Sequence, residues 1–148
     1  YAGGYAERIV DAVSAHIIDN PFFDKSADFD SVRKGLYCGN CGSFELLKSR
    51  FHLMCRGCGS KESNETHLLR AMSDYQILFY GKGMTRNALV EFIGEKMHSK
   101  TVSRALLKHC YGNKNGNTTT YKFKYRDLED ALDKADINIK YKDYIRGE

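Results

Sequence analysis

The stretch YCGNCGSFELLKSRFHLMCRGCGS, residues 37–60, carries four of the five cysteines in this chain of 148 residues. They form two Cys-x-x-Cys-Gly pairs with thirteen residues between them. Two thiolates three positions apart on a tight turn can face one ion, and the following glycine lets the backbone turn behind the second sulfur. The spacing therefore predicts a single zinc site whose ligands are Cys38, Cys41, Cys55 and Cys58.

Reduced cysteines in a loop, or two disulfides, are the alternatives to a metal site. Disulfides are typical of secreted domains, but the chain shows no signal peptide, and Cys110 would be left unpaired. His52 and His67 are potential ligands nearby, although four thiolates already complete a tetrahedral site. Such a site leaves no position for water or substrate, so the zinc is expected to be structural.

The connection between the two pairs predicts a small ribbon. Its segment FELLKSRFHLM, residues 44–54, alternates around Lys48–Arg50, as two short strands and a turn would. We expect the four-cysteine zinc ribbon to cover residues 34–62.

Composition limits the classes of protein to consider. Hydrophobic residues make up 42% of the chain and aromatic residues 12%, which is enough for a core. No apolar run approaches the roughly 20 residues that span a membrane. The formal net charge is +4, and zinc on four thiolates would lower it to about +2. Total charge is therefore a weak argument for a nucleic-acid partner, but basic residues concentrate between Lys82 and Lys124.

Residues 1–33 are expected to form an N-terminal helix and a connection. Apolar residues at helical spacing, with His16 among them, predict a helix over residues 5–19 that ends at Asn20–Pro21. Three aspartates follow, Asp24, Asp28 and Asp30; they suggest a metal cluster, but hydrophobic anchors in a polar loop explain that stretch equally well. The chain begins with Tyr1, which indicates a fragment of a longer protein.

Three helices and a hairpin are predicted after the ribbon. Ser63, Thr85 and Ser99 are suitable N-caps for helices that run to about Phe79, Gly94 and Cys110. Their expected inward residues are Leu68, Leu69, Met72, Tyr75, Phe79, Ala88, Leu89, Phe92, Ile93, Val102, Ala105, Leu106 and Cys110. The Asn- and Gly-rich stretch after Tyr111 predicts a turn, and TTTYKFKY, residues 118–125, predicts an edge strand.

A last helix is expected across residues 127–135, with Leu128, Ala131 and Leu132 facing inward. The tail, residues 136–148, is expected either to add a strand or to remain loose. The predicted fold class is α+β, mainly helical, with an N-terminal helix, the zinc ribbon and a winged helix-turn-helix over residues 63–135.

The winged helix-turn-helix predicts a DNA-binding surface. Its third helix would present small, hydroxylated and cationic side chains to the major groove, and the hairpin would extend that surface. Arg104 is the best single candidate for a base or phosphate contact. The predicted contacts are Lys100, Thr101, Ser103, Arg104, Lys108, Lys114, Asn115, Lys122 and Lys124. Exposed lysines also serve solubility and guard strand edges, which is the competing explanation.

Residues 34–125 resemble the C-terminal region of bacterial proteins that carry a nuclease-related (NERD) domain. The resemblance rests on the following segments and their order: KGLYCGNC (34–41), CRGC (55–58), ETH (65–67), DYQILF (74–79), MTRN (84–87) and TVSRxL (101–106). Many ribbons have proline after the first cysteine, where this chain has Gly39. The resemblance implies a bacterial, cytoplasmic, DNA-handling context and an upstream nuclease core, with residues 1–33 as the end of that upstream domain.

No catalytic motif can be assigned within the chain. We find no phosphate-binding glycine loop, no nucleophile elbow and no nuclease motif on a buried strand. The expected function is thus a zinc-stabilised module that binds DNA, duplex rather than single-stranded, and not an enzyme. The alternative is a protein-interaction or homodimerisation module, for which Phe22, Phe23 and Phe29 are candidate contacts.

Overall fold

The structure is a computed structural model that describes residues 29–79, 82–116, 118–137 and 143–145. The predicted helix over residues 5–19, with His16, lies outside the described residues. So do Asp24 and Asp28 of the aspartate group, as well as Phe22 and Phe23. Within the described ranges, no helix has the length and apolar character needed to cross a bilayer.

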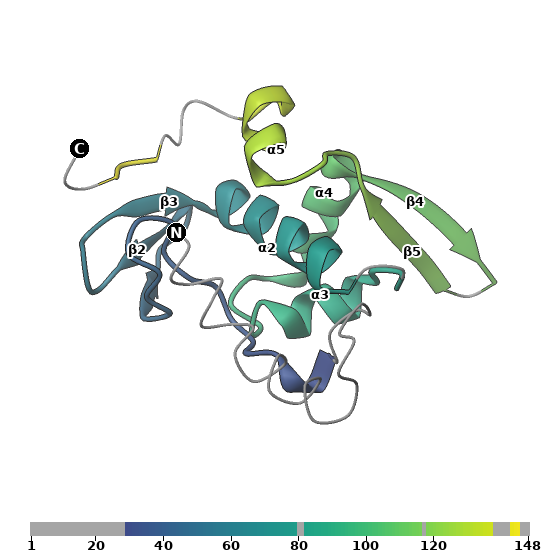
Figure 1. The fold of residues 1–148 in the computed structure, drawn as a ribbon, viewed down its shortest axis with the longest axis horizontal. Coiled ribbons are helices and arrows are strands. Elements are labelled where there is room, and N and C mark those ends of the chain that lie inside the picture. Colours follow the sequence, from purple (N-terminus) through teal and green to yellow (C-terminus); the bar gives the residue numbers. More distant parts are fainter. Residues whose placement is uncertain (1–28, 80–81, 117, 138–142, 146–148) are drawn as a thin grey trace, which may run out of the picture.

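The chain forms two small antiparallel sheets with helices between them (Figure 1). After a short 3-10 helix, η1 (Phe29–Ser31), the first sheet has the order β1 (Leu46–Lys48), β2 (His52–Cys55), β3 (Lys61–Ser63). Helices α2 (Asn64–Leu78), α3 (Arg86–Phe92) and α4 (Ser99–His109) follow. The second sheet is the hairpin of β4 (Cys110–Asn115) and β5 (Thr118–Phe123), and α5 (Leu128–Lys134) comes last.

Helix α2 forms the centre of the core. Its buried residues Leu69, Met72 and Phe79 are at most 1% exposed, because apolar residues recur at helical spacing along this face. Leu89 and Phe92 of α3, and Val102 and Leu106 of α4, are also fully buried. Phe79 and Phe92 pack edge to face with 5.7 Å between their ring centroids. The inward residues predicted for these three helices are buried, except that Ala88 is only half-buried.

The predicted helix starts were correct at Ser63 and Thr85, whose hydroxyls accept hydrogen bonds from the Thr66 and Ala88 N–H groups. The prediction for Ser99 was wrong. His98 is the N-cap of α4, because its extended backbone leaves its ring Nδ1 3.2 Å from the Lys100 N–H, and Ser99 is already helical.

The hairpin differs from the prediction in where its first strand lies. Residues 112–115 were expected to contribute to a turn, but residues 110–115 pair in register with residues 118–123. Gly112 lies opposite Tyr121, whose ring would be 3.7 Å from a Cβ added at the glycine. The tyrosine therefore covers the glycine, and this allows a strand where the composition suggested a turn.

Two further expectations need correction. Helix makes up only about 40% of the structure, so "mainly helical" overstates an α+β fold. Leu132, predicted to face inward, is 45% exposed, because α5 packs on α2 through Leu128 and Ala131 alone. The tail does contribute a strand-like contact, since Tyr144 pairs antiparallel with Lys61.

Candidate metal centre and basic surface

The four predicted cysteines converge on one point. Their sulfur atoms all lie within 4.8 Å of one another, and two of the pairs, Cys41–Cys55 and Cys38–Cys58, are 3.4 Å and 3.6 Å apart. These separations are far longer than a disulfide bond of roughly 2.05 Å. They are close to the roughly 3.8 Å expected between sulfurs of a tetrahedral zinc site, given a Zn–S bond of about 2.3 Å. The side chains therefore fit a metal ion of this kind.

The two cysteine turns have the same backbone design. In the first, the Cys38 N–H donates to Ser43 O at 2.8 Å, and the Gly42 N–H donates to Cys38 O at 2.9 Å. The second turn repeats both bonds, from Cys55 to Ser60 and from Gly59 to Cys55, at the same distances. Gly42 and Gly59 both have φ of 79°, a left-handed conformation that favours glycine. The role predicted for the glycine after each pair is confirmed.

Hydrogen bonds from backbone N–H groups to sulfur stabilise the thiolate form of cysteines in both turns. The Asn40 and Gly57 N–H groups each lie 3.3 Å from a cysteine sulfur, Cys38 Sγ and Cys55 Sγ respectively. The hydrogen bond with Ser60 lowers the pKa of Cys58 to about 6, whereas burial raises the pKa of Cys38 to about 12. A metal ion bound here would have to displace the proton of Cys38, which makes binding dependent on pH.

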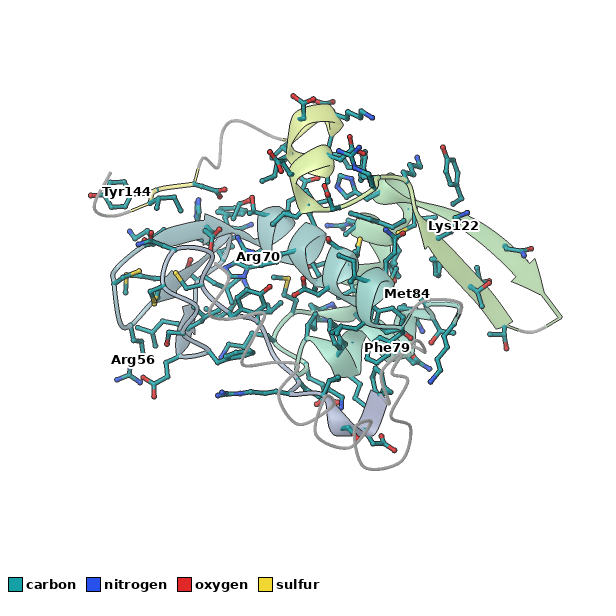
Figure 2. All side chains as sticks on the ribbon, viewed as in Figure 1. Arg56, Arg70, Phe79, Met84, Lys122 and Tyr144 are labelled. Carbon is teal, nitrogen blue, oxygen red and sulfur yellow. The ribbon has the colours of Figure 1, made fainter. Side chains whose placement is uncertain are left out.

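The first turn is docked onto α2 through a buried ion pair. Glu62 Oε1 accepts a hydrogen bond from the Gly39 N–H at 2.8 Å, and Glu62 Oε2 lies 2.5 Å from Arg70 Nη2. Arg70 also donates to Tyr37 O at 3.1 Å, and Tyr37 donates its hydroxyl to Asp74 at 2.7 Å. Figure 2 shows Arg70 in the interior beside α2. These contacts fasten the cysteine turn to the helical part of the chain.

This docking explains Gly39. A Cβ added there would lie 2.2 Å from Arg70 Nη2 and 2.7 Å from Glu62 Oε2, so no larger side chain fits while the pair stays in place. Burial and the charge of Arg70 act oppositely on the Glu62 carboxyl, and the net effect is a lowered pKa. The pair is therefore ionised at neutral pH.

The two histidines near the turns do not join the sulfur cluster. His67 is 1% exposed and contacts Glu62 with its Nε2 at 3.7 Å, while His52 lies half-buried on β2. Burial and the nearby Arg70 lower the pKa of His67 to about 3, so it is neutral at physiological pH. Among the described residues, no other group of His, Cys, Asp and Glu side chains converges in this way.

The predicted DNA contacts lie on α4 and the hairpin. Lys100, Arg104, Lys114 and Lys122 are exposed, and Thr101 and Ser103 are half-buried. Asn115 lies at the end of β4, and nothing further is described for its side chain.

Lys108 and Lys124 are exposed but already engaged. Lys108 pairs with Glu65 at 2.8 Å, and Lys124 donates to Lys108 O at 3.2 Å. The Lys124 ammonium also lies 5.4 Å from the centre of the Tyr111 ring. Lys108 is consequently a weaker candidate for a phosphate contact than the other lysines, because Glu65 already balances its charge.

No sequence pattern indicated the partners of His109. This fully buried last residue of α4 lies 2.7 Å from Glu65 through Nε2 and 3.2 Å from the Tyr125 hydroxyl through Nδ1. Burial opposes ionisation of Glu65, but the hydrogen bonds with His109 and Lys108 outweigh it and lower its pKa to about 2. The cluster holds the end of α4 to the first turn of α2.

Cys110, beside this cluster, is a core residue, as expected. It is 5% exposed, its sulfur lies 3.8 Å from that of Met72, and burial raises its pKa to about 12. It therefore lacks the properties of a reactive thiolate.

Comparisons with known proteins gave no match to a family model, a curated protein or a solved structure. The functional interpretation therefore rests on the residues and their arrangement.

Proposed function

We propose that this chain is a zinc-stabilised winged-helix module that binds duplex DNA through α4 and the β4–β5 hairpin. One observation carries the proposal. Residues 96–126, which form α4 and the hairpin, contain six lysines and two arginines but no Asp or Glu. A segment that is rich in cations and contains no acidic residue, on one helix and the adjoining hairpin, is what a phosphate backbone attracts.

The order of elements supports the winged-helix interpretation. Helices α2, α3 and α4 precede the hairpin, and the connection between α2 and α3 contributes a short strand-like contact. Met84 in that connection pairs antiparallel with Tyr121 of β5, and Met84 O accepts the Tyr121 N–H at 2.7 Å. Under this proposal α4 is the recognition helix, and the hairpin is the wing.

The position of α4 also favours a DNA contact. Its first turn holds no acidic residue, and Lys100 and Arg104 project from its exposed side. Arg104 can form bidentate hydrogen bonds with guanine or with a phosphate, and Lys100 is a suitable phosphate contact. The core beneath them, through Val102 and Leu106, holds the helix in place.

A binding titration of the zinc-loaded chain tests the proposal. A labelled blunt DNA duplex is titrated at two salt concentrations with the wild type and with Lys100→Ala/Arg104→Ala. The proposal requires salt-sensitive binding that the double variant weakens by at least tenfold, with a reduced salt dependence. Arg56→Ala/Lys61→Ala, which removes one exposed arginine and one exposed lysine elsewhere, is the matched control and should bind nearly as the wild type.

Absence of duplex binding by folded, zinc-loaded protein would refute this proposal. The second candidate is a protein-docking role, favoured by exposed apolar side chains on the ribbon, where Leu47 is 47% and Phe51 is 38% exposed. Phe29, named above for dimerisation, instead packs on Phe79 with 5.4 Å between ring centroids. A Leu47→Ser/Phe51→Ser variant that abolishes self-association or partner binding would favour the docking role.

A further inference from the structure

A groove lies between the C-terminal end of α2, the segment 82–84 and the β4–β5 hairpin. Its volume is about 910 Å³, which is within the range of ligand sites, roughly 300–1,000 Å³. Phe79 and Met84, labelled with Lys122 in Figure 2, are among the residues that line it. The proposed recognition helix contributes no residue to this groove, so the groove is a separate feature of the surface.

The floor of the groove is aromatic. Tyr75, Phe79 and Phe123 are at most 5% exposed and form a rigid base. Tyr121 is half-buried above them, and its backbone is fixed by the pairing with Met84. A partly accessible ring on a rigid base is suited to stacking against a flat ligand group.

The rim of the groove is cationic. Lys82 and Lys122 are exposed there, and no Asp or Glu lies among the lining residues. A ligand that satisfies both features carries negative charge and planar apolar groups. Unpaired nucleotides combine the two, since each has a phosphate for a lysine and a base that stacks on an aromatic ring.

Strand β5 links this groove to the proposed duplex surface. Lys122 is a predicted duplex contact and also lines the groove, and its neighbour Tyr121 is a partly accessible ring there. A strand end that leaves a duplex beside the hairpin would have a short path to the groove. An acidic peptide would meet the same lysines, but continuity with a DNA surface favours nucleic acid.

We propose that this groove holds unpaired nucleotides, so that the preferred ligand is a duplex with a single-stranded tail. This inference rests on the proposed function, because α4 supplies the binding to the duplex. Tyr121 would stack on a base of the tail, and Lys82 would contact its phosphates.

The test compares a labelled blunt duplex with the same duplex carrying an oligothymidine tail, at one salt concentration. We expect the wild type to bind the tailed duplex about tenfold more tightly, in keeping with the energy of stacking one base. Tyr121→Leu should remove this preference and leave blunt-duplex affinity unchanged, whereas Tyr121→Phe should retain it. Lys82→Gln should lower the salt dependence for the tailed duplex only.

Tyr144→Leu is the matched control. Tyr144 is 61% exposed, and it lies at the opposite end of the molecule from Lys122 (Figure 2). Circular dichroism establishes that each variant is folded.

Equal affinity for the two duplexes, or a preference that survives Tyr121→Leu, would overturn the inference and leave the proposed function intact. Failure to bind the blunt duplex would instead contradict the proposed function, and tail binding that depends on Tyr121 would still support the groove. Capture of an acidic Glu-Phe peptide in place of the tail, lost in Tyr121→Leu, would assign the groove to a protein ligand and overturn the inference.

Discussion

The two cysteine turns have the same backbone but different surroundings. Both are closed by equivalent hydrogen bonds and by a glycine with φ of 79°. The residue after the first cysteine is Gly39 in one turn, packed beneath the Arg70–Glu62 pair, and Arg56 in the other, exposed to solvent. Figure 2 shows Arg56 at the outer edge of the ribbon and Arg70 in the interior.

This difference indicates that the sulfur cluster and the attachment of the ribbon to the helices depend on different residues. The geometry that gathers the sulfur atoms depends on residues within each turn, so it is local. The attachment of the ribbon to the helices depends on Glu62, Arg70 and Asp74, whose hydrogen bonds reach the first turn through Gly39 and Tyr37. We therefore expect changes in the sulfur cluster to affect both turns, and changes around the first turn to affect the link to α2.

The largest effect is expected from removing a ligand of the metal. Cys38→Ser in the first turn and Cys55→Ser in the second should each abolish stoichiometric zinc and unfold the ribbon, because binding energies of structural zinc sites are about 10–16 kcal/mol. Zinc content and thermal unfolding, with and without a strong chelator, measure this. Cys110→Ser, outside the cluster, should retain one zinc per chain. Full zinc content in either ligand variant would contradict the proposed site.

The second-largest effect on stability is expected at Gly39 and should differ between the two cysteine turns. Gly39→Ala places a Cβ against Arg70 and Glu62, and the shift that it forces on that buried pair should cost about 1–3 kcal/mol. Arg56→Ala, at the equivalent position of the other turn, should change stability by less than about 0.5 kcal/mol, because that side chain is exposed. Denaturant unfolding of the zinc-loaded proteins measures both. Equal losses would mean that the first turn is not docked as described.

The local features of this chain were predictable from its sequence. The cysteine spacing predicted the sulfur cluster, because the required geometry lies within five-residue turns. The caps at Ser63 and Thr85, and the buried face of α2, follow from helical periodicity and hydroxyl side chains. The alternation of TTTYKFKY predicted β5, although it did not predict that Gly112 would lie within the partner strand.

The long-range polar contacts were not predictable in the same way. Glu65 and His109 are 44 residues apart, and neither has a spacing that indicates the other. Glu62 and Arg70 lie closer in sequence, but both bind backbone groups, the Gly39 N–H and the Tyr37 carbonyl, which no side chain identifies. The error at Leu132 is of the same kind, since a seven-residue helix can bury only one narrow face and the sequence does not indicate which neighbour it meets.

The smallest effect on stability is expected from His67, which contacts Glu62 of the buried ion pair at the first turn. Neither ring nitrogen has a hydrogen-bond partner among the residues that the structure describes, and burial lowers the pKa of the side chain to about 3. The unfolded chain binds a proton near pH 6.5 and the folded chain does not, so the free energy of unfolding falls as pH decreases from about 6.5 towards 3. As pH decreases, the cysteines also take up protons and release the metal, which lowers the free energy of unfolding in the same direction.

His67→Leu isolates the histidine contribution. At pH 7.5 the variant should be about as stable as the wild type or slightly more stable, because an unpartnered buried polar group is replaced by an apolar one. Between pH 7.5 and 5.5 its stability should fall less steeply, by up to about 1.4 kcal/mol per pH unit below the histidine's unfolded pKa. The matched change His52→Leu, on the half-buried strand β2, should leave more of the slope in place. If the wild type and His67→Leu gave parallel pH profiles of stability, His67 would take up its proton in the folded chain. The polar cluster under the first turn would then be accessible to water.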